Sequence, residues 1–269
     1  MTAALLLAFA LGACAPAFSA EAPQANRYGA TIVPAERFDV GSLLVERHGQ
    51  RGTPLILVRG LGSGAWAWQD VVRQFSGEHV VYVLTLAGFD SRAPVPGKAL
   101  DNAGDSLHQL IVSRNLDRPV LIGHSMGAAL SIAFAEQYSG LSRGVAAIDG
   151  LPVFPGTEVT DIGRVDELAK LSARSDPAAM VDAMAELFAL DLRPGLPAIK
   201  VPVLLIAPYF EADSAQTGTT REMKTEYNAS LMAGAPDLKV ASIAPARHFV
   251  MFDQPQMLAD ALRAWLQSL

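Results

Sequence analysis

Short runs of consecutive apolar residues recur along the chain from residue 54 onward, and stretches with helical periodicity separate them. Continuous apolar runs of this length are typical of strands buried on both faces of a parallel sheet. Such strands are expected at 54–58, 80–84, 119–122, 144–148, 203–206 and 238–243, with an earlier strand-like segment at 38–46 and helices at 68–75, 106–116 and 126–138. This alternation predicts an α/β fold with a mostly parallel sheet covered by helices on both faces.

The region from 151 to 200 interrupts this alternation, because it contains no run suited to a buried strand. Its apolar spacing instead predicts helices at 165–171 and 177–190, each with one apolar face. We therefore expect one catalytic domain over 31–269, in which residues 151–200 form a small helical cap.

The first twenty residues are apolar, rich in Ala and Leu, and too few to span a bilayer comfortably. They predict an export signal, which a polar, Pro-containing linker at 21–30 joins to the domain. Residues 11–14 also match the bacterial lipobox, in which the cysteine, here Cys14, receives lipid; cleavage near Ala17 or Ala20 is the alternative. We expect an exported protein that is periplasmic, secreted, or tethered to a membrane through a lipidated Cys14.

Charge and cysteine content exclude several classes of protein. The net charge is −6 and the sequence has no long basic run, so we expect no nucleic-acid partner. Cys14 is the single cysteine, which excludes an internal disulfide and argues against thiolate metal ligands. Since CxxC, HExxH and Gly-Lys-Ser patterns are also missing, we expect neither a metal nor a cofactor.

The segment 123–127 has the pattern G-x-S-x-G, and it lies between an expected strand and a helix of small residues. A sharp turn at this point would hold the serine in a strained backbone conformation, which requires glycines on both sides. This context predicts that Ser125 is a nucleophile.

Two backbone N–H groups are candidates for holding a negatively charged oxygen next to Ser125. Met126 opens the expected helix, where unpaired N–H groups favour negative charge. The Gly-rich segment 59–63 follows the strand 54–58, and the N–H of Leu61 could reach the same oxygen. A plain turn between strand and helix is the alternative for that segment.

A serine hydroxyl needs a neighbouring base, and histidine titrates in the suitable range. His248 lies just after the last expected strand, at the position along the chain where a base is required. His124 precedes Ser125 directly, so we expect its side chain to point elsewhere.

The strand order, the serine motif, the Gly-rich loop and the late histidine resemble the α/β-hydrolase superfamily from about Phe38 onward. This resemblance implies an eight-stranded, mostly parallel sheet and a chain order of serine, acid, histidine. Single-domain members with a short cap, such as carboxylesterases and proline iminopeptidases, are the most similar. Arg59 departs from the pattern, because such proteins commonly have histidine there, and the side-chain network around it is expected to differ.

Two aspartates are candidates for the acid that orients His248. Asp149 stands directly at the end of the strand 144–148, a position from which some relatives supply the acid, and a strand end fixes a side chain well. Asp213 lies in the loop after the strand 203–206, where many relatives carry it. We prefer Asp149; the alternatives are a turn cap for Asp149 and a solvated loop charge for Asp213.

The expected activity is that of a serine hydrolase that cleaves a small-molecule carboxylic ester through an acyl-enzyme. Trp66 and Phe154 are candidates for the substrate pocket, although core packing explains each equally well. A lactone, a thioester or an N-terminal peptide bond are alternative substrates. A non-catalytic envelope protein that binds ligands with the same fold is the alternative from another class.

Overall fold

The computed structural model describes residues 31–154, 170–215 and 217–269. The predicted export signal, the linker, Cys14 and most of the helix expected at 165–171 lie outside the described residues. In the described part of the chain, none of the helices has the length and apolar composition needed to cross a lipid bilayer.

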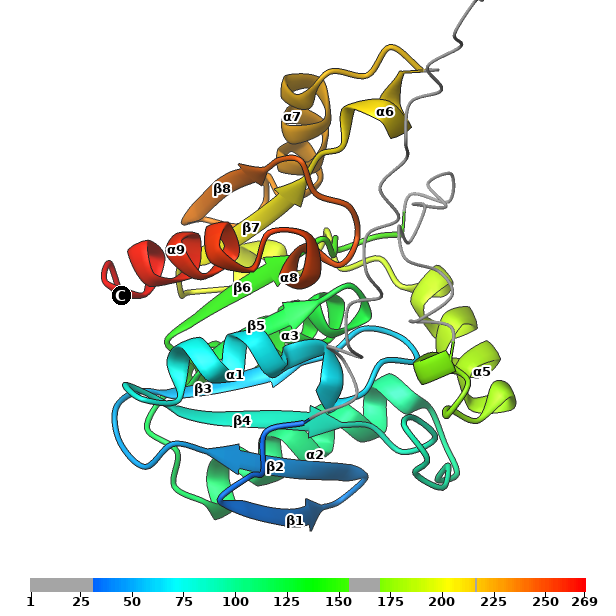
Figure 1. The fold of residues 1–269 in the computed structure, drawn as a ribbon, viewed down its shortest axis with the longest axis vertical. Coiled ribbons are helices and arrows are strands. Elements are labelled where there is room, and N and C mark those ends of the chain that lie inside the picture. The colour runs from blue at the N-terminus through cyan, green and yellow to red at the C-terminus, as the bar shows by residue number, and fades with distance from the viewer. Residues whose placement is uncertain (1–30, 155–169, 216) are drawn as a thin grey trace, which may run out of the picture.

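Eight strands form one sheet in the order β1-β2-β4-β3-β5-β6-β7-β8 (Figure 1). Neighbouring strands run parallel from β4 through β3 to β8, whereas β2 is antiparallel to both β1 and β4. Their bounds are β1 Glu36–Val40, β2 Leu43–His48, β3 Pro54–Val58, β4 Val80–Thr85, β5 Val120–His124, β6 Gly144–Ile148, β7 Val203–Pro208 and β8 Leu238–Ile243. The predicted α/β fold with an eight-stranded, mostly parallel sheet is confirmed.

Successive residues of the central strands pack into two different cores, which explains why those strands are continuously apolar. In β3, Ile56 and Val58 face one core, while Leu55 and Leu57 face the other. The first core is covered by α2 (Ala99–Ser113) and α3 (Met126–Tyr138), and the second by α1 (Gln69–Phe75) and α9 (Pro255–Leu266). The sheet is therefore the middle layer of three.

The remaining helical segments lie mostly in the connections between strands. They are η1 Ala65–Trp68, η2 Ser139–Leu141, α5 Pro177–Ala189, η3 Leu196–Ala198, α6 Glu211–Ser214, α7 Arg221–Leu231 and α8 Val250–Asp253. Helix α5 and η3 belong to the region predicted to form a cap, and α5 lies beyond the carboxyl ends of the central strands (Figure 1). Residues 155–169 of that region lie outside the described residues, so its cap role stays a prediction.

Two local predictions were wrong. The segment 38–46, expected as one strand, is a hairpin that turns at Gly41, whose φ of +54° suits glycine. The helix expected to begin at Ser106 begins at Ala99, because the carboxylate of Glu186 accepts hydrogen bonds from the first two N–H groups of that helix.

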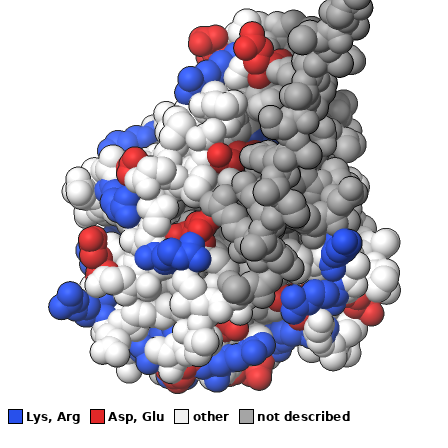
Figure 2. All heavy atoms as spheres, in the orientation of Figure 1, with Lys and Arg blue, Asp and Glu red and all other residues white. Residues whose placement is uncertain are grey.

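Charges of both signs are interspersed over the described surface visible in Figure 2. Several of them pair with one another, as Arg47 does with Glu36 at 3.0 Å and Arg92 with Asp39 at 2.9 Å. Such exposed pairs each contribute about 0–1 kcal/mol to stability, so the fold depends mainly on its two apolar cores.

Candidate active site

Ser125 forms the sharp turn between β5 and α3. Its backbone has φ +54° and ψ −122°, a region that residues with a side chain rarely adopt. Main-chain hydrogen bonds hold the turn on both sides: Ser125 N–H donates to Ile148 O of β6 at 2.9 Å, and Ser125 O accepts from Ala128 N–H of α3 at 2.9 Å. The predicted nucleophile is thus partly exposed on a rigid corner at the carboxyl edge of the sheet.

The two glycines of the motif are required by close packing around this corner. A Cβ atom on Gly123 would lie 2.2 Å from Gly127 O, and one on Gly127 would lie 2.2 Å from Val58 O. Both distances are far below van der Waals contact with backbone that cannot move away. A side chain at either position would push α3 away from β5 or β3, as the motif predicts.

His248 and Asp149 form a hydrogen-bonded pair at the edge of the sheet where Ser125 lies. His248 Nδ1 lies 2.6 Å from Asp149 Oδ2, and the side chains are 21% and 13% exposed. Asp149 follows β6, the neighbour of β5, so the aspartate and the serine occupy the ends of adjacent parallel strands. Burial raises the pKa of Asp149, but the hydrogen bond from His248 and its charge outweigh burial and leave the pKa lowered. Asp149 is therefore ionised at neutral pH.

His124 supports the main chain of His248, a role that the sequence analysis missed. Its Nε2 donates to His248 O at 2.8 Å, and the two rings lie 4.6 Å apart between centroids. Burial, aided by the charge of His248, lowers the pKa of His124 to about 3, so the ring is neutral. The ring is directed at the histidine loop, and nothing in its position along the sequence indicated that contact.

Asp213, the other candidate acid, lies in α6 and is paired with Arg247. The guanidinium donates to its two carboxylate oxygens at 2.6 and 2.8 Å. These hydrogen bonds lower the pKa of Asp213. The same guanidinium stacks over the Phe210 ring at 3.8 Å. The structure thus pairs Asp213 with Arg247, and it pairs Asp149 with His248.

Met126 and the loop that carries Leu61 both lie against Ser125. Met126 is buried at the first position of α3. The loop that carries Leu61 passes against the serine from the side of β3, because a Cβ atom on Gly60 would lie 3.0 Å from Ser125 Cβ. Backbone N–H groups in such positions can stabilise a negative oxygen formed at the serine.

The two aromatic candidates for the substrate pocket lie in different surroundings. Trp66 is 2% exposed and its ring stacks on Phe252 with centroids 6.0 Å apart, so it belongs to the core that α1 and α9 cover. Phe154 is partly buried and packs edge-on against Phe188 of α5 at 4.6 Å. Phe154 belongs to the region predicted to cover the site, and its ring contacts α5 of that region.

No group of three or more His, Cys, Asp and Glu side chains that could hold a metal ion occurs within residues 31–154, 170–215 and 217–269. At this edge of the sheet the described residues bring Asp149, His124 and His248 together near the Ser125 corner.

A family model described as the alpha/beta hydrolase family matches residues 55–261, most of the chain. The chain belongs to the α/β-hydrolase family. The match includes Ser125, Asp149 and His248, and it begins within β3, just before the Gly-rich loop.

Curated α/β-hydrolase relatives match parts of the chain. Lipase 1 of Psychrobacter immobilis is 32% identical over 90 residues, which is 32% of this chain and 28% of that protein. A 2-(acetamidomethylene)succinate hydrolase of Mesorhizobium japonicum is 27% identical over 129 residues, or 47% of this chain and 46% of that one. In both cases the chain spans less than half of the relative's length.

Solved structures match nearly the whole fold. An esterase from Thermogutta terrifontis superposes with a TM-score of 0.70 at 22% identity, covering 87% of this chain and 99% of that one. An enol-lactonase from Burkholderia xenovorans gives 0.70 at 17% identity, covering 86% and 100%. At these identities the likeness establishes the shared α/β-hydrolase fold.

Proposed function

We propose that this α/β hydrolase is a serine esterase that cleaves carboxylic esters of small molecules through an acyl-enzyme. One observation carries the proposal: Ser125 stands on a strained corner at the end of β5, and Asp149, at the end of the adjacent strand β6, is hydrogen-bonded at 2.6 Å to His248 of the loop after β8. The connections that follow β5, β6 and β8 thus supply the proposed nucleophile, acid and base, respectively.

In the first half of the reaction, Ser125 Oγ attacks the ester carbonyl carbon while His248 Nε2 takes the hydroxyl proton. Asp149 accepts the hydrogen bond from Nδ1, which fixes the tautomer that leaves Nε2 free to act as base. The ionised carboxylate also stabilises the imidazolium that forms. His124 holds the carbonyl of His248, so the ring stays oriented between acid and nucleophile.

The tetrahedral intermediate carries its negative charge on the former carbonyl oxygen. The N–H groups of Leu61 and Met126 are the proposed donors to that oxygen, and losing one such donor typically lowers the rate by about 10²–10³. The imidazolium then protonates the leaving alcohol, which departs and leaves the acyl group on Ser125. Water attacks this acyl-enzyme with His248 again as base, which releases the acid and restores the serine.

Apolar side chains around the oxyanion loop favour an uncharged acyl or alcohol group. Met180 of α5 lies against Gly62, where an added Cβ atom would be 2.7 Å from its methyl carbon. Leu61, Phe154 and Met180 are partly buried against the same core. The names of the similar proteins, an esterase, a lipase and a lactonase among them, agree with ester chemistry and leave a lactone as the nearest alternative.

We further propose that the enzyme works outside the cytoplasm, held at a membrane when Cys14 carries lipid. The apolar residues 1–20 and the match at 11–14 support this location. Mass spectrometry of the mature protein tests it: a diacylglyceryl group on Cys14 supports export with a tether, an unmodified chain that begins after Ala17 or Ala20 supports export without one, and a chain that keeps residues 1–20 contradicts export.

The test of the activity is hydrolysis of p-nitrophenyl esters of increasing acyl length by the full chain and by Ser125→Ala. We expect turnover that falls by about 10³-fold or more in the variant, with a preferred acyl length that reports the size of the pocket. Absence of turnover on esters and lactones alike would contradict the proposal and favour a peptidase or a binding protein.

A further inference from the structure

The loop that carries Leu61 is closed by one buried guanidinium. Arg59, at the start of the loop, is 0% exposed; it donates through Nε to Leu84 O and through Nη1 to Ser63 O at 2.7 Å. These bonds join the first residue of the loop to its last and to the end of β4. Burial lowers the pKa of Arg59 to about 9, which still leaves it charged at neutral pH.

The counter-ion of Arg59 comes from the loop after β4. Asp90 Oδ2 lies 3.8 Å from Arg59 Nη1, and Asp90 Oδ1 lies 2.9 Å from Nη2 of Arg174, which is half exposed. Asp90 and Ser91 both have positive φ values, +50° and +67°. A residue with a side chain rarely holds such a backbone, so the loop is fixed by the contacts that it makes.

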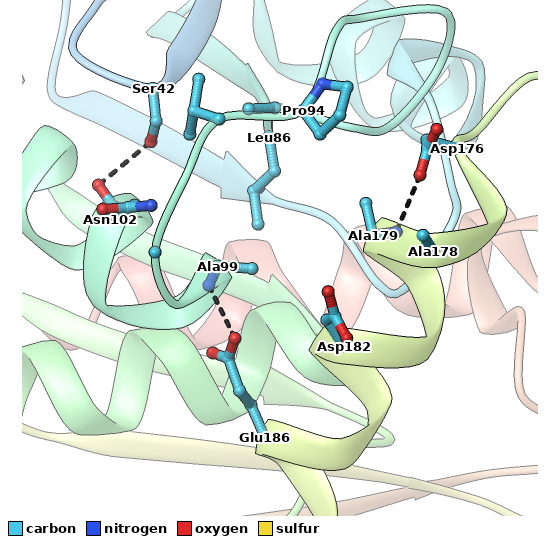
Figure 3. Close-up of a pocket in the computed structure, with 13 residues that line it drawn as sticks. Ser42, Leu86, Pro94, Ala99, Asn102, Asp176, Ala178, Ala179, Asp182 and Glu186 are labelled. Atoms are coloured by element: carbon cyan, nitrogen blue, oxygen red, sulfur yellow. Dashed lines mark hydrogen bonds between the residues drawn. The ribbon is translucent and has the colours of Figure 1, made fainter.

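The residues just before α5 are hydrogen-bonded to the oxyanion loop and to the loop after β4. Ser175 Oγ accepts from Asp90 N–H at 3.1 Å and donates to Gly62 O at 3.2 Å, next to Leu61. Arg174 O accepts from Ser91 N–H at 2.7 Å, and Asp176 N–H donates to Gly88 O at 2.7 Å. Asp176 also caps α5 through Ala179 N–H (Figure 3). Side chains and main chain therefore connect α5 to the oxyanion loop without a break.

We propose that Arg59, Asp90 and Ser175 are positioning residues that fix the Leu61 N–H relative to Ser125 and couple its position to α5. The inference rests on the proposed serine-hydrolase function and deepens it. A Gly-rich loop has few side chains of its own to hold it, and here Arg59 supplies that support. A shift of α5 on substrate binding would then be transmitted to the oxyanion donor through Ser175 and Asp90.

The test compares Asp90→Asn and Ser175→Ala with the wild type. Asp39→Asn is the matched control. Asp39 of β1 pairs with Arg92 of the loop after β4, so this change also removes a carboxylate from an arginine of that loop, at a pair that does not include the oxyanion loop. Each protein is assayed for kcat and KM on the best p-nitrophenyl ester, for inhibition by a trifluoromethyl ketone, and for its melting temperature. The ketone adds to the serine and places an oxyanion at the same donors.

Asp90→Asn is expected to lower kcat by about tenfold or more while KM stays within about twofold. The affinity for the ketone is expected to fall by the same factor as kcat. Ser175→Ala is expected to act in the same direction by a few-fold, and Asp39→Asn to behave as the wild type. Ser175→Ala changes one hydroxyl only, so it tests the inference even where Asp90→Asn does not fold.

A lower melting temperature with unchanged kcat and ketone affinity would assign these residues a structural role alone and overturn the inference. A rise in KM at constant kcat would also overturn it, because it would place the effect on substrate binding. Failure of the proposed function itself gives a different result: wild-type protein then neither turns over esters nor binds the ketone.

Discussion

Two adjacent residues of one loop each pair with an aspartate: Arg247 with Asp213, and His248 with Asp149. The two pairs differ in how deeply the aspartate is buried and in which element positions it. Asp149 follows β6 directly, is 13% exposed and accepts from His248 at 2.6 Å. Asp213 lies beyond the end of β7 in the short helix α6, is 36% exposed and pairs with Arg247. A parallel strand fixes the residue at its end, so the position directly after β6 is suited to hold a catalytic acid, whereas the later position supports an exposed ion pair.

The largest expected effect comes from Asp149→Asn. The amide can donate to Nδ1, which stabilises the wrong tautomer of His248 and leaves the imidazolium without its counter-charge. We expect kcat for a p-nitrophenyl ester at pH 8 to fall by about 10³–10⁴, with a melting temperature close to that of the wild type. A rate within tenfold of the wild type would remove Asp149 from the mechanism.

His124, which contacts His248 of the buried pair, makes the stability of the protein depend on pH. Folded His124 has a pKa of about 3 against 6.5 for an ordinary histidine, so the unfolded chain binds a proton that the folded chain does not as the pH falls below 6.5. His124→Gln keeps an N–H donor and cannot titrate. Between pH 7 and 4.5 the wild type is expected to lose about 2 kcal/mol more free energy of unfolding than this variant.

Urea unfolding followed by tryptophan fluorescence measures this difference at the two pH values. Equal losses in the wild type and His124→Gln would show that His124 is accessible to protons in the folded protein. The same result would contradict the burial of His124 against the main chain of His248.

A third carboxylate tests whether partial burial alone makes an acid important for the rate. Glu186 of α5 accepts from Ala99 N–H at 2.8 Å and Leu100 N–H at 2.9 Å, the first bond being drawn in Figure 3. Glu186→Gln loses the charge at the start of α2 and one good acceptor, which should lower the free energy of unfolding by about 1 kcal/mol. We expect kcat to stay within about twofold, and urea titration with an ester assay checks both. A tenfold drop in kcat would show that α2 and α5 control the site.

The smallest effect is expected for Asp213→Asn. Its partly exposed pair with Arg247 should contribute less than about 1 kcal/mol, and kcat should change by less than about twofold. Asp213→Asn is the matched control for Asp149→Asn, and the same ester assay and melting curve measure both variants. A large loss of rate here would reverse the assignment of the two acids.

The central strands and the serine corner could be predicted from sequence because their signals are local. Apolar runs identify strands that face two cores. The G-x-S-x-G pattern is itself a local signal, although Gly123 is required by contacts within its own strand–turn–helix unit and Gly127 by contact with β3. The hairpin at Gly41 was missed because the alternation of residues continues through its turn, although Gly followed by Ser was a usable signal.

The parts that could not be predicted depend on partners distant in sequence. The start of α2 is set by Glu186, which lies more than eighty residues away. The choice between Asp149 and Asp213 depends on which of two neighbouring loop residues reaches each acid. His124 and Arg59 acquire their roles only where the histidine loop and the loop after β4 fold back on them. Patterns along the chain contain no information about these pairings.

Covalent titration of Ser125 with a fluorophosphonate tests the central claim most directly, because it needs no knowledge of the substrate. The account predicts one phosphonyl group per chain, located on Ser125 by peptide mapping, at a rate that falls about 10³-fold or more in Asp149→Asn and stays near the wild-type rate in Asp213→Asn. Folded protein that leaves Ser125 unlabelled, or that labels equally fast without the Asp149 carboxylate, would contradict it.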